Sequence, residues 1–470
     1  ISFLLVLLFT TQIFSAQRET SYYEFIRLES DQPLTSRVRS GDLSPEREAF
    51  VRGERRLRPL LSLLNQDIPF DFIFSGYVKN ATFWDTRQVF GVADNYVLFL
   101  PKDRLCDACG NDINAAGQFN MLPIETRVIA NIFGPKIGSA YSGARISGDF
   151  FSVPSGTILV EPLDAFNRFT MRHAYFKLMW PEWSLIAGQT WHPMMFPITS
   201  PDTVSFNTGL TFALFARVAQ IRATYHHEHV ELVTAMLSQT FFVSLGPRGL
   251  TGQYFRNSLT PEFVFHGTVF LGRHMIGAGI NYKRLVPRLV TNKNIKTNTA
   301  IGSIIAVAHV ELHFDRFDWY VKGMYAQNGT NFGVLGGYAV HSINPCNDKR
   351  EYTNLNTASI WTEMIVRTTP IEPAIFIAYA KTLGAHNTII QSTLDANNKE
   401  ESTVYAFFPK VDYAWRISPR IRWVYKAFEV AAELEYTRAA YGDIGPKGKV
   451  INTQPPVDNF RFLLTLTYYY

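Results

Sequence analysis

The sequence predicts an all-β protein, a transmembrane antiparallel β-barrel of about sixteen strands, within a range of about 14 to 18. Three observations favour this fold. Apolar and polar residues alternate with period two from residue 68 to the last residue, the alternating stretches reach a dozen residues, and short connections alternate with long ones. After residue 16 no stretch approaches the roughly 18 consecutive apolar residues that a membrane-spanning helix needs, so a helical membrane protein is excluded.

The composition excludes several other classes. The 470 residues include 37 Phe, 22 Tyr and 8 Trp, and 47% are hydrophobic, which excludes a disordered or low-complexity chain. Lys and Arg number 45 against 40 Asp and Glu, a net charge of +5. That excess is too small for a dedicated nucleic-acid binder, so no nucleic-acid partner is expected.

The first residues indicate export. Residues 1–16 combine an apolar run with a small-residue end, as a secretory signal peptide does, and the pattern predicts cleavage between Ala16 and Gln17. The alternative is a buried strand or helix at the start of the fold. An exported barrel belongs in the bacterial cell outer membrane.

Residues 17–66 form a separate periplasmic segment ahead of the barrel at 67–470, because they are highly charged and lack the period-two pattern. Ser44-Pro45-Glu46 is a helix-start signature. An apolar stripe at helical spacing follows it, made of Phe50, Leu57, Leu60, Leu61 and Leu64. Two interpretations stay open: an association helix or lumen plug, and a short amphipathic helix lying on the barrel rim.

Cys106, Cys109 and Cys346 are the three cysteines of the sequence. In an oxidising compartment Cys106 and Cys109 are disulfide candidates, either with each other or with one of them bonded to Cys346. Free thiols are the alternative. A zinc site is disfavoured because a second pair of ligands is missing from the sequence. No metal and no cofactor are expected.

The alternation defines the strands one by one. In the last strand the side chains of Phe460, Phe462, Leu466, Tyr468 and Tyr470 face one way, while those of Arg461, Thr465 and Thr467 face the other. The expected strands span residues 69–86, 124–134, 137–152, 166–180, 183–192, 209–226, 229–242, 262–272, 274–287, 300–314, 317–328, 358–369, 373–383, 403–425, 428–441 and 458–470.

Connection lengths predict which rim each loop occupies. Long gaps such as 87–123 and 329–357 follow odd-numbered strands, and short gaps such as Pro181-Glu182 follow even-numbered ones. Outer-membrane barrels place short turns on the periplasmic rim and long loops on the other. The longest loop, 87–123, is expected to fold inward and narrow the lumen, with the turn at Cys106 and Cys109 near its tip.

If the apolar side of each strand faces lipid, the opposite side faces the lumen. The charged residues predicted to line the pore are Arg127, Arg145, Arg222, Lys322, Arg420, Arg422, Glu433 and Glu435. One interpretation is an arginine-rich wall that favours anions, with Arg127, Arg145 and Arg222 unpaired. The other is that Arg420 and Arg422 pair with Glu433 and Glu435 on the neighbouring strand and brace the wall.

Aromatic residues near the expected strand ends predict a girdle at the membrane interface, although a carbohydrate-stacking role is an alternative. These residues are Trp180, Trp183, Trp191, Trp319, Tyr320, Trp415 and Trp423. The direction of Arg172 stays open, because the alternation breaks at Arg172-His173.

The sequence contains no nucleophile-elbow, zinc-protease, P-loop or dinucleotide motif, so no enzymatic activity is expected. The histidine cluster at residues 226–229 falls in a short turn, where a solvated turn is a better interpretation than a metal site. Besides a channel, two other functions stay open: an outer-membrane hydrolase whose catalytic residues meet across strands, and a closed structural or surface-adhesive barrel.

Several motifs resemble a known family. The C-terminal Tyr468-Tyr469-Tyr470 resembles the aromatic signal by which the barrel assembly machinery recognises its substrates. More specific are Ser75-Gly76-Tyr77-Val78-Lys79, Gly110-Asn111-Asp112-Ile113-Asn114 and Gly188-Gln189-Thr190-Trp191-His192-Pro193. Together they resemble the porin-like outer-membrane barrels of the Bacteroidota, which are similar in turn to the DcaP-like trimeric porins.

The resemblance runs from about residue 68 to residue 470 and implies a homotrimeric diffusion channel in the outer membrane. The arginine-rich wall predicts that its solutes are small, hydrophilic and anionic. Its partners would be outer-membrane lipid and lipopolysaccharide and the barrel assembly machinery. Residues 17–66 depart from the family, because no matching segment or clear coiled coil is present there.

Overall fold

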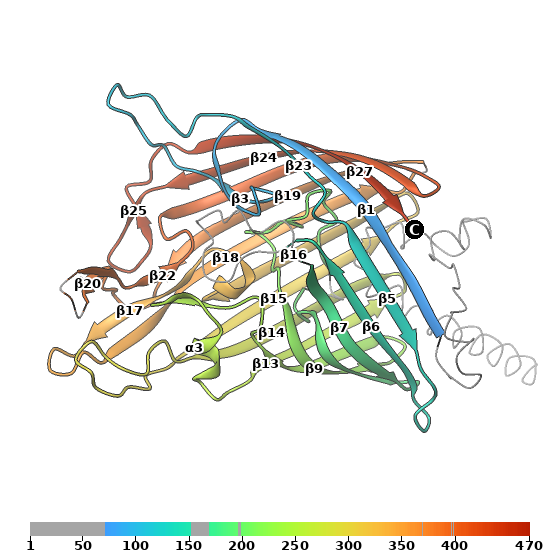
Figure 1. Ribbon diagram of the computed structural model, residues 1–470, viewed down its shortest axis with the longest axis horizontal. Coiled ribbons are helices and arrows are strands. Elements are labelled where there is room, and N and C mark those ends of the chain that lie inside the picture. The colour runs from blue at the N-terminus through green and yellow to red at the C-terminus, as the bar shows by residue number, and fades with distance from the viewer. Residues whose placement is uncertain (1–70, 152–168, 196–198, 369, 396, 398) are drawn as a thin grey trace, which may run out of the picture.

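The computed structural model describes residues 71–151, 169–195, 199–368, 370–395, 397 and 399–470. Within them, sixteen long strands form one closed antiparallel barrel (Figure 1). The strands of the barrel wall are β1 (Asp71–Asp85), β5 (Arg127–Phe133), β6 (Tyr141–Asp149), β7 (Thr170–Met179), β8 (Trp183–Trp191), β9 (Arg217–His226), β10 (Val230–Ser238), β13 (Glu262–Leu271), β14 (His274–Leu285), β15 (Ile301–His313), β16 (Phe317–Gln327), β18 (Arg350–Val366), β19 (Ile371–Gly384), β23 (Val411–Tyr425), β24 (Phe428–Tyr441) and β27 (Val457–Tyr469).

The first and last strands close the barrel. β1 and β27 pair in register from Tyr77 opposite Tyr469 to Asp85 opposite Arg461. The backbone of Tyr470 extends this pairing, since its N–H donates to the Gly76 carbonyl at 3.1 Å and its carbonyl accepts from the Gly76 N–H at 3.0 Å. Closure removes the unpaired sheet edge that an open barrel would expose.

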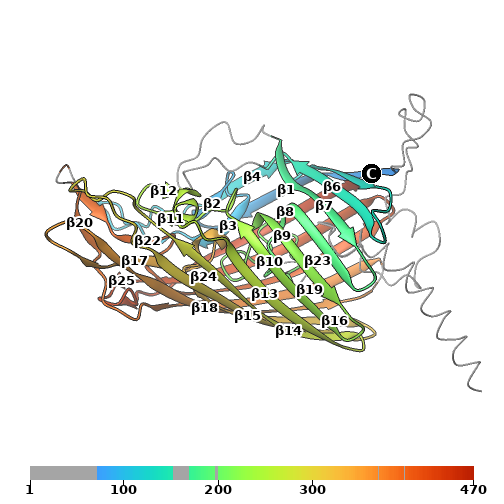
Figure 2. The ribbon, with the colours of Figure 1, turned by 90° about the horizontal axis from the view of Figure 1, so that it is seen from below.

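Shorter elements extend the wall or decorate one end. β4 (Gln118–Leu122) pairs with β1, and β17 (Gly337–Ile343) lies between β18 and β22 (Val404–Ala406). The small hairpins are β2–β3 (Val89–Val92, Val97–Pro101), β11–β12 (Leu245–Gly246, Gly249–Leu250), β20–β21 (Ser392–Leu394, Glu400–Ser402) and β25–β26 (Asp443–Ile444, Val450–Ile451). In Figure 2 the hairpins β11–β12 and β20–β21 and the strand β25 lie toward the end opposite the C-terminus.

Helical structure is minor. The described residues contain α3 (Gln253–Arg256) and the 3₁₀ turn η4 (Thr330–Phe332). No helix in these ranges is long and apolar enough to cross a membrane.

Period-two alternation gives the wall two chemically different faces. In β27, Phe460 is 45% exposed and Tyr468 55% exposed, whereas Arg461 between them in the sequence is 1% exposed. The same alternation in β24 buries Glu433 and exposes Leu434. An apolar outer face suits lipid and a polar inner face suits the lumen of a membrane barrel.

The structure confirms the predicted fold class and the order of short and long connections. The main differences in strand bounds are as follows. The strand expected at 209–226 begins at Arg217, because residues 209–216 leave the wall and run inside the barrel. The span 403–425 divides into β22 and β23, and the strand expected from residue 358 begins at Arg350, because β17 extends the sheet beside it. The predicted signal peptide at 1–16 and the segment at 17–66 lie outside the described residues.

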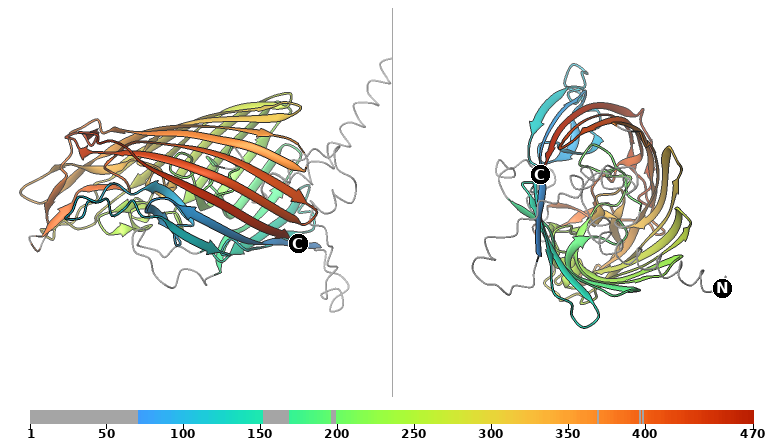
Figure 3. Two further views of the ribbon diagram at one scale, coloured as in Figure 1. Left: turned by 90° about the horizontal axis from the view of Figure 1, so that it is seen from above. Right: turned by 90° about the vertical axis from the view of Figure 1, so that its right-hand side faces the viewer.

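Two parts of the long-loop rim run inside the ring of strands (Figure 3, right). The first is the hairpin β2–β3, residues 89–101, called here the inner hairpin. The second comprises residues 192–195 and 199–216 and is called the inner segment. Their apolar residues form the main buried cluster of the protein together with side chains of the wall.

Candidate functional site inside the barrel

The inner hairpin is held by two arginines of the wall. Arg416 of β23 donates from Nη2 to the carbonyl oxygen of Phe99 at 3.0 Å. Arg461 of β27 donates from Nη2 to the carbonyl oxygen of Asn95 at 2.8 Å. Since carbonyls inside the barrel need donors, these charged donors satisfy them and fix the hairpin in place.

The inner segment is held by carboxylates of the wall. Glu433 of β24 accepts hydrogen bonds from the backbone N–H groups of Val204 and Ser205, the latter at 3.0 Å. Glu363 of β18 accepts the backbone N–H of Asp202 at 2.9 Å. Hydrogen bonds to a charged acceptor are worth about 1.5–3 kcal/mol each, so these contacts fix the position of residues 202–205.

Asp202 also attaches the inner segment through its side chain. Its Oδ2 lies 3.1 Å from Arg420 Nη2 and 3.0 Å from Arg422 Nη1. Burial alone would raise the pKa of the Asp202 carboxyl, but Arg422 and Arg420 hold that pKa below its usual value of 3.8. Asp202 is therefore ionised at neutral pH and forms an ion-pair latch to β23.

Further contacts hold both ends of the inner segment. Lys322 of β16 donates from Nζ to the carbonyl oxygens of Met194 at 2.8 Å and Thr199 at 3.0 Å. Ser359 of β18 donates from Oγ to the carbonyl oxygen of Phe212 at 2.7 Å. The wall thus binds the segment along its length rather than at one point.

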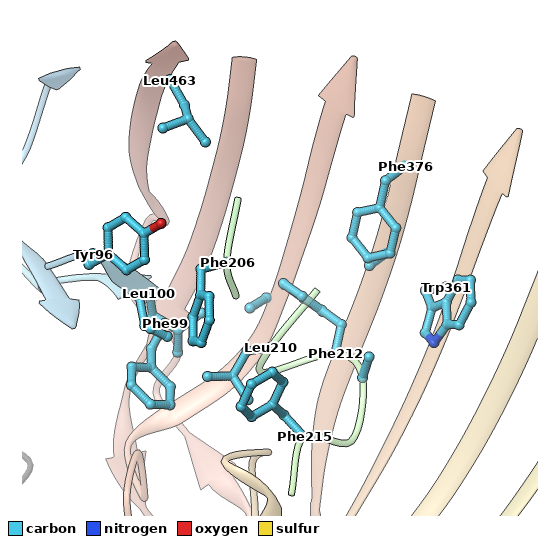
Figure 4. Close-up of a cluster of buried hydrophobic side chains, with 14 of the residues drawn as sticks. Tyr96, Phe99, Leu100, Phe206, Leu210, Phe212, Phe215, Trp361, Phe376 and Leu463 are labelled. Carbon is cyan, nitrogen blue, oxygen red and sulfur yellow. The ribbon is translucent and has the colours of Figure 1, made fainter. Parts of the chain in front are cut away.

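Apolar side chains join the two inner elements to each other and to the wall (Figure 4). The centroid of the Phe206 ring lies 5.6 Å from the ring centroid of Tyr96 in the inner hairpin and 5.9 Å from that of Phe215 in the inner segment. Trp361 of β18 and Phe376 of β19 point inward and belong to the same cluster. Their burial makes the inner elements part of the folded core.

All eight charged residues predicted to line the pore have buried side chains on the inner side of the wall. They are Arg127, Arg145, Arg222, Lys322, Arg420, Arg422, Glu433 and Glu435. Their direction follows the parity of each strand. Whether solutes pass along them stays a prediction.

The expected pairing of these residues was wrong in two respects. Arg127 is not unpaired, because its Nη2 lies 3.1 Å from Asp149 Oδ2, and Arg145 and Arg222 are not without partners either. Arg420 has its ion pairs with Asp202 and Glu363 rather than with Glu433, which holds the inner segment instead. A sequence shows cross-strand neighbours but not a loop that enters between them.

A β-bulge explains the broken alternation at Arg172. Ser147 of β6 lies opposite His173, whereas the next residue, Gly148, lies opposite Met171, so Arg172 is the extra residue. Arg172 and His173 are consequently both buried, at 2% and 1% exposure. Arg172 joins Arg127 on the carboxylate of Asp149, at 2.8 Å.

The loop 87–123 enters the barrel with its inner hairpin, not with its cysteine turn. Residues 104–111 are all exposed, so the expected inward fold of this loop applies to its hairpin and not to its tip. Cys106 and Cys109 are free thiols, and no disulfide joins them. The Asp107 carboxylate holds the turn instead, accepting the backbone N–H groups of Cys109 and Asn111 at 2.8 Å each.

The outer face carries part of the expected aromatic girdle. Trp183, Trp319 and Trp423 are 50%, 40% and 38% exposed. Trp191 and Tyr320 depart from it, since both are buried inside the barrel. Trp191 instead lies against the guanidinium groups of Arg172 and Arg217, 5.3 and 5.2 Å from its ring centroid.

The inner segment, with Asp202 and Glu363, is the part of the candidate site that the sequence interpretation missed. A usable signal was present: residues 192–216 contain Pro193, Pro197, Pro201 and Gly209 and lack sustained period-two alternation. Proline removes a backbone donor and is disfavoured inside a sheet. The stretch therefore fits a loop better than the first half of a strand.

No protein-family model matches the sequence, and no curated protein matches it. Solved structures match its fold. The outer membrane channel DcaP of Acinetobacter baumannii is 13% identical with a TM-score of 0.60, over 85% of this chain and 97% of that chain. OmpT of Vibrio cholerae in its trimer form is 9% identical with a TM-score of 0.49, over 86% and 100%. The anion-selective porin from Comamonas acidovorans is 9% identical with a TM-score of 0.48, over 85% and 100%. The likeness to DcaP shows that this chain has the barrel fold of an outer-membrane channel.

Proposed function

We propose that this protein is a porin of the bacterial outer membrane, a passive diffusion channel for small hydrophilic solutes. The observation that carries the proposal is that the barrel is apolar outside and polar inside, the reverse of a water-soluble protein. Phe462 and Leu466 of β27 are exposed on the outside, while Arg461 and Thr465 between and beside them are buried inside. An apolar exterior requires lipid around it, and a charged interior offers polar solutes a route across that lipid.

The inner hairpin and inner segment set the size limit of the channel. Both occupy the barrel interior and are bonded to its wall, through Arg416 and Arg461 on one side and Glu433 and Glu363 on the other. A constriction of this kind lets small hydrophilic molecules pass and excludes large ones.

We further propose that the channel prefers anions, because five neighbouring strands carry a strongly uneven set of buried charges. Strands β5 to β9 contribute Arg127, Arg145, Arg172, Arg217 and Arg222. The acidic residue on the same five strands is Asp149. In a confined lumen of low effective dielectric constant, such charges create an electrostatic potential of several kT for an ion.

Planar-bilayer recording tests both parts of the proposal. The wild-type channel is expected to give stepwise ohmic currents, and a salt gradient is expected to give a reversal potential of anion sign. Replacing Arg127, Arg145 and Arg222 by Ser should move that potential toward cation selectivity, most at low salt where screening is weakest. Arg273→Ser is the matched control, because Arg273 pairs with Asp315 in exposed turns, its side chain 43% exposed.

Two results would overturn the proposal. A wild-type channel that prefers potassium over chloride contradicts the anion preference. No current at any voltage contradicts the channel itself and favours a closed structural barrel, the alternative that the buried apolar cluster around Phe206 supports.

We also propose that the channel is a homotrimer in contact with outer-membrane lipid and lipopolysaccharide, assembled by the barrel assembly machinery. Native mass spectrometry of the detergent-extracted protein is expected to give a mass of about three chains. A monomer in mild detergent would contradict the trimer while leaving the channel proposal intact.

A further inference from the structure

We propose that His266, His309 and Met194 form a binding site for a soft monovalent metal ion, Cu(I), inside the barrel. The site goes beyond the proposed channel function and does not depend on it. It lies where the wall strands β13, β14 and β15 meet the start of the inner segment.

The backbone of β14 is shaped to bring the two imidazole rings together. His266 on β13 lies opposite Gly279, and His309 on β15 lies opposite Gly277. A Cβ atom at Gly277 would lie 2.4 Å from His309 Nε2, and one at Gly279 would lie 2.6 Å from His266 Cδ2. The two glycines therefore leave room for the rings to reach each other across the intervening strand.

The two ring nitrogens stand at a chelating separation. His266 Nε2 and His309 Nε2 are 3.1 Å apart, and the ring planes are inclined by 20°. With metal–nitrogen bonds of about 2.0–2.1 Å, this separation gives a nitrogen–metal–nitrogen angle of about 95–102°. That angle suits three- or four-coordinate metal ions. The ring centroids are 5.2 Å apart, so the rings now point at each other as in a hydrogen bond, and metal binding also requires each ring to tilt toward the ion. Both rings are buried, at 1% and 2% exposure.

Hydrogen bonding prepares His309 for this role. Its Nδ1 lies 2.8 Å from the Thr199 hydroxyl oxygen. When Nδ1–H donates to that oxygen, Nε2 keeps a free lone pair, as in the outer shell of most metal-binding histidines. Without metal, His266 donates Nε2–H to this lone pair. Binding requires the ring proton of His266 to move to Nδ1, with no net change in protons.

The third donor selects the metal. Among the described residues no group of three His, Cys, Asp or Glu side chains could hold a metal ion, so the site needs another kind of ligand. The thioether of Met194 is buried, and its Sδ lies 3.0 Å from the Cβ position of Gly279, beside the His266 ring. Thioether sulfur favours soft ions, and among biological ions Cu(I) combines softness with affinity for imidazole.

The surrounding charges favour a monovalent ion. Lys322 lies opposite His309 on β16, and the carboxylates acting on the two rings are those of Glu231 and Glu311. The one ammonium and the two carboxylates sum to a net charge of −1, which a monovalent ion neutralises, whereas Zn²⁺ would leave a net positive charge buried in the wall.

The test uses Ag⁺, a soft monovalent ion that is stable in air, and the full-length barrel purified in detergent. Because the exposed thiols of Cys106, Cys109 and Cys346 would bind Ag⁺ more tightly than imidazole does, every protein in the test carries Ser at these three positions. Equilibrium dialysis with metal analysis is then expected to find one Ag⁺ per chain at this site. His266→Gln and His309→Gln should each weaken binding by about tenfold or more, the scale known for altered metal shells. Met194→Leu should weaken Ag⁺ binding and leave the weaker Zn²⁺ binding unchanged.

The matched control is the exposed turn between β9 and β10, where His227→Gln and His229→Gln should leave the site intact. Heat-modifiable migration on gels checks that each variant is folded. Equal Ag⁺ affinity in the wild type and in His309→Gln would overturn the site. Binding that disappears with the turn histidines alone would overturn it as well. Zn²⁺ binding tighter than Ag⁺ would overturn the assignment to Cu(I). None of these readouts depends on channel current.

Discussion

The Asp202 latch offers the sharpest test of how the inner segment is held. Asp202→Asn keeps the size of the side chain but removes the charge that Arg420 and Arg422 contact at 3.1 and 3.0 Å. The other anchors stay, including the hydrogen bond from the Asp202 backbone to Glu363. The variant therefore perturbs the segment without removing its backbone contacts.

The magnitude follows from those two contacts. A hydrogen bond to a charged group contributes about 1.5–3 kcal/mol, and the amide oxygen of asparagine retains part of each. Arg420 keeps Glu363, and Arg422 keeps Glu372 and Glu429, so neither cation is left without a carboxylate. We expect the closed position of the segment to lose about 2–3 kcal/mol, which raises its opening equilibrium about 30- to 150-fold.

Single-channel recording measures this equilibrium as the frequency of transient larger conductance states. The matched control is Asp458→Asn, which removes a carboxylate paired with Arg438 at 2.5 Å on the outer face of the barrel. Asp202→Asn should raise the frequency of the larger states and Asp458→Asn should not. Equal current fluctuations in both variants and the wild type would refute the latch.

Three further predictions concern pH, assembly and the outer loop. The pKa of Asp202 in the folded protein is depressed below 3.8, so the latch contributes fully above that value and is lost as pH falls through the lower folded pKa. The difference in opening between the wild type and Asp202→Asn should therefore persist down to about pH 4 and vanish only below it, and loss of that difference near about pH 6 would contradict the latch. Deleting Tyr468 to Tyr470 should abolish heat-modifiable barrel, since β1 loses its partners at Tyr77 and Val78, whereas Tyr470→Phe should assemble normally. Replacing residues 104–111 by a Gly-Gly turn should leave conductance unchanged, because these residues are exposed, and a changed conductance would show that the tip reaches the lumen.

The barrel wall could be predicted from the sequence because its information is local. Side-chain direction in a strand depends only on parity, so the outward Phe460 and the inward Arg461 follow from their positions. The same rule placed Arg420 and Glu433 inside without knowledge of their partners. It failed where one extra residue changes the parity, as at Arg172, since a bulge leaves no reliable mark in a single sequence.

The inward fold of loop 87–123 was predicted, but the position of the inner segment and the partners of both inner elements could not be, because these contacts join positions far apart in the chain. Glu433 binds backbone groups of Val204 and Ser205, more than two hundred residues earlier. A glutamate that caps a distant loop has the same local sequence as one that pairs with the neighbouring strand. Parity therefore gave the direction of Glu433 correctly and its partner incorrectly.

The wall charges have a structural task that is separate from the proposed selection of solutes. A loop inside a barrel carries backbone groups that lack the water available at a surface, so each needs a partner from the wall. Arginine side chains donate to backbone carbonyls, as Arg461 does to Asn95, and carboxylates accept from backbone N–H groups, as Glu433 does from Ser205. Charges used in this way balance one another around β18, β23 and β24. On strands β5 to β9 the buried arginines outnumber the carboxylate of Asp149. Ion selectivity should therefore respond to substitutions on those five strands, while substitutions on β23 and β24 should chiefly change how firmly the inner segment is held.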